Sequence, residues 1–315
     1  MRKICVLGGT GFVGKHLVHR LVEQGWQVTV LTRQLNRSCP LSILPTVKLV
    51  AVSNLYDQQE LNQHLAGHDV VVNLIAILNE KGRDGRGFEK VHVELPKKVV
   101  EACRVNQIKR LLHVSALNSG APNSSHYLRT KGEGETIVHA ATDLQVTSFK
   151  PSVIFGEDDE FFNRFIRLLR LTYVFPLACP EAKFAPVWVD DVVNAMINSI
   201  DNPLHFGKRY NLCGPKIYTL QQLVEYAAKL AKLSRLILPL GNSLSYLQAA
   251  VFERVPTKPL SLDNYRSLQI DSVCSENHLS DLGVTPHTIE FVMPQYFTTI
   301  TPRAQYTRYR EQARR

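Results

Sequence analysis

Three glycines spaced three residues apart, Gly8, Gly11 and Gly14, follow an apolar run at 4–7. The run has the composition of a buried strand, and an amphipathic helical pattern begins directly after the glycines. Glycine lets the chain bend sharply and approach a ligand closely at such a turn. The first turn of a helix presents free N–H groups and a positive dipole end to a phosphate. The stretch predicts a phosphate-binding strand–turn–helix unit; a βα turn without a ligand is the alternative.

Apolar strand-like runs alternate with helical patterns through the first half of the chain, at 4–7, 26–31, 47–52, 70–76, 111–115 and 146–150. Strands that are apolar throughout indicate a parallel sheet covered on both faces. Ligands of such sheets bind beyond the carboxyl ends of the strands. We therefore expect an α/β fold with a Rossmann-type, doubly wound parallel sheet. Its expected parts are a nucleotide-binding domain over 1–155, interleaved with about 187–215, a smaller substrate or lid lobe over 156–301, and a basic tail over 302–315.

The charge and cysteine content limit the partners. A formal net charge of +9 favours anionic partners: dinucleotide phosphates, an acidic protein face or a membrane surface. There is no basic stripe interleaved with aromatic residues, so we expect no nucleic acid partner. The six cysteines contain no C-x-x-C pair, which predicts a reducing compartment and neither a disulfide framework nor a zinc site. We expect no metal site.

Two features bear on location. The first strand begins within a few residues of Met1, so we expect no targeting peptide. No apolar run reaches the roughly 18 residues that a membrane-spanning helix needs. The stretch 236–255 is interrupted by Pro239 and Gly241, which predicts a buried or grooved segment. A cytoplasmic location is expected, with peripheral contact to the inner face of the membrane left open.

The residues that follow the second strand bear on the choice between NADP(H) and NAD(H). NAD-binding folds of this kind usually place an acid near this point to hold the ribose 2′-hydroxyl. No acid occurs at 34–40, where Arg33 and Arg37 offer positive charge instead. Arginine suits a 2′-phosphate and can stack on adenine. The pattern favours NADP(H), with NAD(H) as the alternative. An Arg33 that is simply a solvated loop residue would not indicate either cofactor.

Tyr127 and Lys131 are spaced i, i+4 and so share one face of a helix. A nearby ammonium lowers the pKa of a tyrosine by favouring the phenolate, which makes it a usable general acid or base. The lysine can also bind the nicotinamide ribose, and Ser115, at the end of the fifth strand, can bind a substrate carbonyl. A surface pair is the alternative for an isolated Y-x-x-x-K motif.

These motifs, in this order along the chain, resemble the extended short-chain dehydrogenase superfamily. The resemblance rests on the glycine turn, Tyr127/Lys131, and the segments 150–156, 187–192 and 210–215. Segments 92–96, 112–118 and 127–135, with Asp263-Asn264-Tyr265, resemble the atypical group that contains the NAD(P)H-binding accessory subunit of respiratory complex I. That group also includes bacterial homologues and a fungal protein of ubiquinone biosynthesis.

The resemblance implies cofactor contacts along the first two-thirds of the chain, although several of the apolar residues could equally be core. Asn54 stands where relatives more often have Asp. The implied cofactor residues are Gly8, Thr10, Gly11, Phe12, Val13 and Gly14 in the turn, Arg33, Asn54 and Leu55 near the adenosine, Leu74, Ile75 and Ala76 after the fourth strand, and Tyr127, Lys131, Pro151 and Val153 near the nicotinamide.

Two departures from active relatives bear on function. His92 stands where such enzymes usually carry an Asn of the proton relay, and the gap from Ser115 to Tyr127 is short. Both weaken the case for catalysis and leave cofactor binding intact. The favoured function is an NAD(P)H-binding protein accessory to complex I or quinone metabolism. The alternatives are an NADP-dependent oxidoreductase or epimerase/dehydratase using Tyr127, Lys131 and Ser115, and a redox-sensing regulator.

Two later features complete the predictions. Residues 157–171 combine phenylalanines with arginines, which suits either a face for a quinone, lipid or partner, or a buried helix with snorkelling arginines. The buried helix is the favoured interpretation. Asp190 and Asp191 are interpreted as a helix cap and a hinge.

Overall fold

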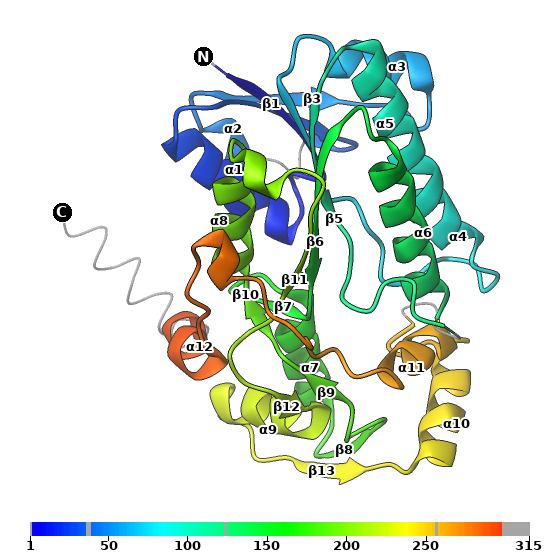
Figure 1. The fold of residues 1–315 in the computed structure, drawn as a ribbon. Helices are drawn as coiled ribbons and strands as arrows, with labels where there is room; N and C mark the ends of the chain where they lie inside the picture. The colour runs from blue at the N-terminus through cyan, green and yellow to red at the C-terminus, as the bar shows by residue number, and fades with distance from the viewer. Residues whose placement is uncertain (1, 36–38, 123–124, 256–257, 298–315) are drawn as a thin grey trace.

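A seven-stranded parallel sheet forms the centre of the fold in a computed structural model that describes residues 2–35, 39–122, 125–255 and 258–297 (Figure 1). The strand order is β11-β6-β5-β4-β1-β2-β3, so the direction of strand addition reverses between β1 and β4. This confirms the predicted doubly wound α/β fold. The strands are β1 (Lys3–Leu7), β2 (Gln27–Thr32), β3 (Val47–Ala51), β4 (Val70–Asn73), β5 (Arg110–Val114), β6 (Gln145–Pro151) and β11 (Arg209–Leu212).

Helices cover both faces of the sheet (Figure 1). The central strands are apolar and buried on both sides, and β4 is buried at every residue, as parallel strands between two helical layers must be. On one face the sheet packs against α1 (Phe12–Glu23) and α8 (Val189–Ser199). On the other it packs against α3 (Gln58–Leu65), α5 (Leu95–Val105) and α6 (His126–Ala140), while α2 (Cys39–Ser42) lies beside β3.

The helix before β5 contains a π-helical turn. It consists of α4 (Arg86–Glu89), the π-helical η2 (Lys90–Glu94) and α5 in succession. Helix α6 crosses this turn closely at Gly134, where an added Cβ would collide with the carbonyl oxygen of His92. A single π turn inside a helix often marks a functional site, and here it brings His92 against α6.

The elements after β6 gather mainly at the carboxyl ends of the strands (Figure 1). Their core contains the apolar face of α7, including Phe162 and Ile166, and Arg164 donates hydrogen bonds to the carbonyls of Lys258 and Pro259. The buried-helix interpretation of 157–171 is therefore confirmed. These elements are β7 (Ile154–Phe155), α7 (Glu160–Leu171), β8 (Val174–Leu177), β9 (Lys183–Phe184), β10 (Val187–Trp188), η3 (Pro203–His205), β12 (Tyr218–Thr219), α9 (Leu220–Leu230), β13 (Leu236–Pro239), α10 (Asn242–Phe252), α11 (Leu262–Leu268), η4 (Ser280–Leu282) and α12 (Ile289–Phe297).

The prediction that the cysteines form no disulfide is wrong. Cys213, just after β11, is bonded to Cys274, and 61 residues separate them in the chain. That separation carries no local signature, and only the fold brings the two Sγ atoms together. Cys5, Cys103 and Cys179 are free and buried.

The interpretation of the Asp190–Asp191 pair as a helix cap is also wrong, and the hinge stays a prediction. Trp188 is the N-cap residue of α8, and both aspartates lie in the first helical turn. Asp190 pairs with the His16 ring of α1 at 2.8 Å, and Asp191 accepts from the backbone N–H and ring of His287, each at 2.8 Å. The two carboxylates therefore tie α8 to α1 and to the chain before α12.

Within the described residues, no helix is long and apolar enough to cross a membrane. The predicted domain boundaries remain predictions, and the basic tail over 302–315 lies outside the described residues, as does Arg37.

Candidate functional site

The glycine turn has the close packing that its spacing predicts. Gly8 has a positive φ of 84°, a conformation that glycine adopts without strain. A Cβ on Gly14 would collide with the carbonyl oxygen of Gly8 and lie 2.6 Å from the Cα of Gly9. Gly14 thus lets α1 begin directly against the turn, and the N–H of Gly11 closes the turn by donating to Gly8 O at 3.0 Å.

The N-terminus of α1 is open for an anion. Gly11 is the N-cap residue and supplies no side-chain cap, and the first turn carries no acidic residue. The N–H groups of that first turn, which includes Phe12 and Val13, have no partner within the helix. Thr10 lies in the turn itself. The dipole of α1 favours negative charge at this point, which meets the requirement for a phosphate.

The end of β4 lies against the glycine turn. A Cβ on Gly8 would come 3.2 Å from the carbonyl carbon of Leu74 and 3.3 Å from the N of Ile75. The N–H of Leu74 donates to Leu7 O at 3.0 Å. Leu74 and Ile75 are half-buried and Ala76 is exposed. Leu74 and Ile75 therefore border the turn on the side of the switch point, and the prediction that they and Ala76 line the cofactor stays a prediction.

The adenosine-side residues follow β2 and β3. Arg33, next after β2, is exposed and forms no ion pair within the described part of the chain. The pKa of the Tyr56 hydroxyl is raised overall. Burial raises it most, the Glu94 charge adds to the shift, and the Arg33 charge opposes it. Asn54 is exposed and its Oδ1 accepts from Tyr56 N at 3.0 Å, while Leu55 is partly buried. Arg33 and Asn54 therefore both neighbour the same loop.

The structure brings Ser115 and Lys131 together. The Lys131 ammonium donates to the carbonyl of Val114 at 2.5 Å, one residue before Ser115. The Ser115 hydroxyl is buried and has no hydrogen-bond partner among the described residues. Burial lowers the pKa of Lys131 to about 8, and the Glu135 carboxylate opposes that shift.

Tyr127 differs from the expectation. Burial raises its pKa to about 12, whereas the sequence motif predicts a lowered value. Desolvation on burial is the cause, because it penalises the phenolate. Its ring packs edge-on against His92 and Phe88, with centroid distances of 5.5 and 6.1 Å.

Pro151 and Val153 lie where β6 ends, on either side of the buried Ser152. Pro151 O accepts from Leu117 N at 3.1 Å, and Val153 O accepts from Val187 N at 2.9 Å. These bonds fix the strand end beside the loop that follows Ser115. The chain here can border a ring on the nicotinamide side.

His92, which the sequence marks only as a departure from active relatives, has a structural role in the site. Its Nε2 accepts from the N–H of Ile77 at 3.1 Å, so the proton of the neutral ring lies on Nδ1, which donates to Thr130 Oγ1 at 3.0 Å. Burial, with a smaller contribution from the Lys131 charge, lowers the pKa of His92 to about 3. The ring therefore stays neutral and joins the loop after β4 to helix α6.

Asp263 of α11 is a second residue of this kind. Its carboxylate accepts from the backbone N–H groups of His126 and Tyr127, at 2.6 and 3.1 Å. It thus satisfies free N–H groups at the start of α6, together with the Ser125 cap. The contact spans 137 residues of sequence, so no local pattern predicts it.

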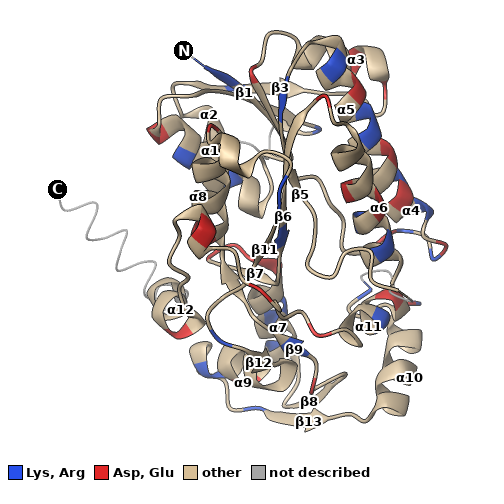
Figure 2. Ribbon diagram, in the orientation of Figure 1, with Lys and Arg blue, Asp and Glu red and all other residues tan. Residues whose placement is uncertain are grey.

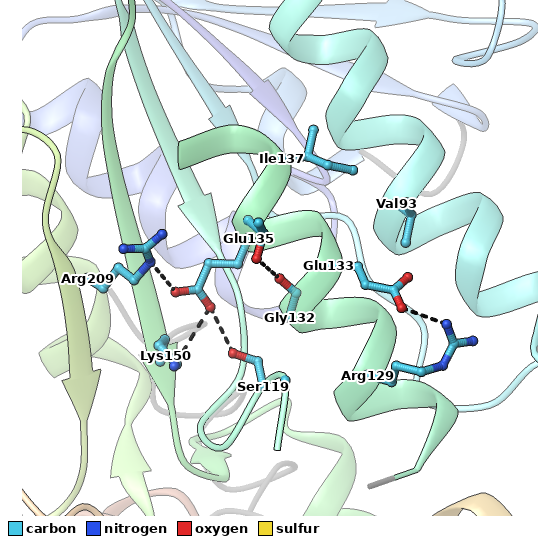
Figure 3. A pocket seen from close by; sticks show the side chains of 11 residues that line it. Val93, Ser119, Arg129, Gly132, Glu133, Glu135, Ile137, Lys150 and Arg209 are labelled. Carbon is cyan, nitrogen blue, oxygen red and sulfur yellow. Dashed lines mark hydrogen bonds and ion pairs between the residues drawn. The ribbon is translucent and has the colours of Figure 1, made fainter. Parts of the chain in front are cut away.

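A separate open cavity of about 890 Å³ lies on a different flank of α6 (Figure 3). The buried Glu135 carboxylate accepts there from Ser119 Oγ at 2.8 Å and pairs with Arg209 Nε at 3.0 Å. Arg129 and Glu133, one turn apart on α6, pair at 2.7 Å on one side of the cavity. Its charged groups are already matched to one another, and neither tyrosine nor lysine of the Y-x-x-x-K motif lines it.

The fold and the glycine turn together define a Rossmann-type nucleotide-binding protein. Residues 4–213 match the NAD dependent epimerase/dehydratase family, which is two-thirds of the chain. The chain belongs to this family. No group of three or more metal-ligating side chains occurs in the described ranges.

Three similar proteins illustrate the range of the family. NADH dehydrogenase (ubiquinone) 1 alpha subcomplex subunit 9 of Rattus norvegicus is 29% identical over 300 residues, covering 90% of this chain and 77% of that protein. Ceramide reductase of Caulobacter vibrioides is 27% identical over 201 residues, covering 64% and 62%. The structure of a UDP-glucuronic acid 4-epimerase variant from Bacillus cereus, with NAD, has a TM-score of 0.76 at 15% identity and covers 95% of this chain and 100% of that one.

The residues present fit a dinucleotide. A Cβ at Gly14 would fill the space where α1 meets the turn, the first turn of α1 is uncapped, and the buried Ser115 hydroxyl is unpartnered. All three features lie at the carboxyl ends of the strands, beside the switch point of the sheet.

Proposed function

We propose that this chain is an NAD(P)H-binding protein that serves as an accessory component of a respiratory NADH:ubiquinone oxidoreductase or of quinone metabolism. The observation that carries the binding role is the uncapped start of α1 behind Gly14. The pyrophosphate would lie on the N–H groups of that turn, which includes Thr10, Phe12 and Val13. Leu74, Ile75 and Ala76 would border the cofactor from β4, and Pro151 and Val153 would border the nicotinamide. Tyr127 and Lys131 would bind its ribose.

The accessory role is supported by the similarity to the rat subunit over 90% of the chain. It is also supported by the site itself. His92 is locked neutral between Ile77 and Thr130, and Tyr127 is held in an environment that keeps its proton. Such a site suits a cofactor that is held rather than turned over. The protein would then sit peripherally, on the cytoplasmic side of the membrane.

We propose NADP(H) in preference to NAD(H), because Arg33, just after β2, is exposed and has no ion-pair partner among the described residues. Arg33→Ala should weaken NADPH binding roughly tenfold or more, since hydrogen bonds to charged groups contribute about 1.5–3 kcal/mol. Binding of NADH should change little. Fluorescence titration with both cofactors measures this. Arg104→Ala, in the last turn of α5 just before β5 and so at the amino ends of the strands, is the control. Equal losses for NADPH and NADH would contradict the preference.

An active reductase is the second candidate, favoured by the unpartnered Ser115 hydroxyl and by the similarity to a ceramide reductase. A bound nicotinamide would supply or accept a hydride. Ser115 would then donate a hydrogen bond to the substrate oxygen, Tyr127 would give or take the proton at that oxygen, and Lys131 would orient the ribose.

Tyr127→Phe distinguishes the two candidates. In the accessory role, the variant should keep its assembly with partners and, within about 0.5 kcal/mol, its stability, because the hydroxyl makes no hydrogen bond to the described residues. Its cofactor affinity should fall by roughly tenfold at most, through loss of one ribose contact. Titration, native gels and thermal unfolding measure these. For a reductase, loss of general acid–base catalysis would lower NADPH-dependent turnover at saturating cofactor by about 10²–10⁴-fold. That result would replace the accessory role.

A further inference from the structure

Many of the exposed apolar side chains of the described residues gather along one edge of the molecule. The edge runs from the end of α7 through β8 and β13 to α10, and lies at the bottom of Figure 1. Leu171 and Tyr173 are each 79% exposed, and Leu247 of α10 is 57% exposed. We call this the apolar edge; its members are Leu171, Tyr173, Val174, Leu236, Leu238, Leu244, Tyr246, Leu247, Val251 and Val255.

The fold holds these side chains in one surface. Strands β8 and β13 pair in parallel, with Val174 opposite Leu236. Helix α10 is tied to them because Gln248 donates to Pro176 O at 2.9 Å and Cys179 N donates to Ser245 Oγ at 3.1 Å.

Helix α10 presents opposite faces to the core and to solvent. Its buried residues are Ser245 and Ala249. Leu244, Leu247 and Val251 follow an i, i+3, i+7 pattern on the other side and are 50–57% exposed. A helix in a globular protein normally buries such an apolar stripe, so an exposed one indicates an interaction surface.

The charges around the apolar edge are mainly basic, and Glu253, between its members Val251 and Val255, is an exception. Between residues 161 and 180 the only charged residues are three arginines, and between 226 and 252 they are Lys229, Lys232 and Arg235. Figure 2 shows basic residues on α7, on α9 and in the chain that leads into β13. The Arg235 guanidinium lies 4.6 Å from the centre of the Tyr173 ring, so apolar and basic groups are interleaved.

We propose that the apolar edge docks on the surface of an anionic phospholipid bilayer. Leucine and tyrosine side chains would enter the interfacial region, and the lysines and arginines would meet lipid phosphates. A second copy fits less well, since a symmetric dimer through this edge would bring cations against cations. The proposal takes one element from the proposed function, namely that the protein is located at a membrane.

Flotation of the full-length protein with vesicles tests this. We expect binding to phosphatidylcholine vesicles that contain phosphatidylglycerol, and much weaker binding to pure phosphatidylcholine. Lys229→Glu with Lys232→Glu should lower binding to the anionic vesicles roughly tenfold or more. Leu244→Ser with Leu247→Ser should lower it by a similar factor. Ile43→Ser with Leu204→Ser, at sites 80% and 77% exposed on other parts of the surface, is the matched control and should bind as wild type.

Vesicle binding that is absent, or equal in wild type and both edge variants, would overturn the proposal. A concentration-dependent dimer that the leucine variant abolishes would assign the edge to a second copy instead. Titration of NADPH on the same preparations keeps the two inferences apart. Vesicle binding without cofactor binding would contradict the proposed function alone. Cofactor binding without vesicle binding would contradict the docking of the apolar edge alone.

Discussion

Gly14→Ala should weaken dinucleotide binding by about a hundredfold or more, the loss expected when two charge-assisted hydrogen bonds are broken. The added Cβ would collide with Gly8 O and lie 2.6 Å from the Cα of Gly9. Helix α1 must then move away from the turn, and its N–H groups no longer converge on one phosphate. Isothermal titration with NADPH, and quantification of the dinucleotide released from natively purified protein, measure the effect.

The same substitution should also destabilise the protein. Overpacking costs about 1–3 kcal/mol, and the better helix propensity of alanine offsets about 1 kcal/mol of that. Gly241→Ala is the control, because no atom lies within 4 Å of its added Cβ. It should leave binding unchanged and shift stability by a few tenths of a kcal/mol. Wild-type affinity in Gly14→Ala would refute the placement of the phosphate at α1.

Lys131→Met should move stability and cofactor affinity in opposite directions. Burial lowers the pKa of Lys131 to about 8, so at neutral pH the folded protein holds an ammonium that prefers to lose its proton. Removing it should raise the free energy of unfolding by up to about 3 kcal/mol, at 1.36 kcal/mol for each pKa unit. Affinity for the dinucleotide should fall at least roughly tenfold, through loss of a charged hydrogen bond to the ribose.

The pH dependence of the free energy of unfolding shows whether the charged form of Lys131 destabilises the fold. The destabilising effect of Lys131 is fully present below its folded pKa of about 8 and disappears as the pH rises to the unfolded value near 10.5. The wild type should therefore gain stability relative to Lys131→Met across that interval. Chemical denaturation between pH 7 and 10.5 measures the difference. Lys97→Met, on the exposed side of α5, is the control. A variant that is less stable than wild type at pH 7 would contradict the assigned cost of the buried ammonium.

The parallel sheet and the glycine turn were predictable because each is encoded locally. Strands that are apolar throughout indicate burial on both faces, and the spacing of Gly8, Gly11 and Gly14 reports a backbone packing that no other residue allows. The roles assigned to Ser115, Tyr127 and Lys131 remain predictions, although the Lys131–Val114 contact places two of the three residues together.

What the sequence could not reveal depends on contacts between distant segments. Cys213 and Cys274 meet only because the chain returns beside β11, and Asp263 reaches the start of α6 from α11. The environment of Tyr127 is of the same kind: the i, i+4 lysine is visible in the sequence, but the burial that raises its pKa is not.

The apolar segments illustrate a further limit. The stretch 236–255, expected to be buried or grooved, instead forms much of the exposed apolar edge, whereas one face of helix α7 is buried. A periodicity of 3.6 residues identifies an apolar helical face, and it does not say whether that face meets protein or solvent.

The most direct test of the accessory role is a native gel of gently solubilised membranes from cells that carry the tagged protein, with an in-gel assay for NADH dehydrogenase activity and mass spectrometry of the band. We predict that the protein comigrates with a large assembly that contains this activity, and that Gly14→Ala reduces the comigrating fraction. Migration as a small species with a dinucleotide bound would contradict the accessory role, and would leave a free-standing NAD(P)H-dependent enzyme built on Ser115, Tyr127 and Lys131.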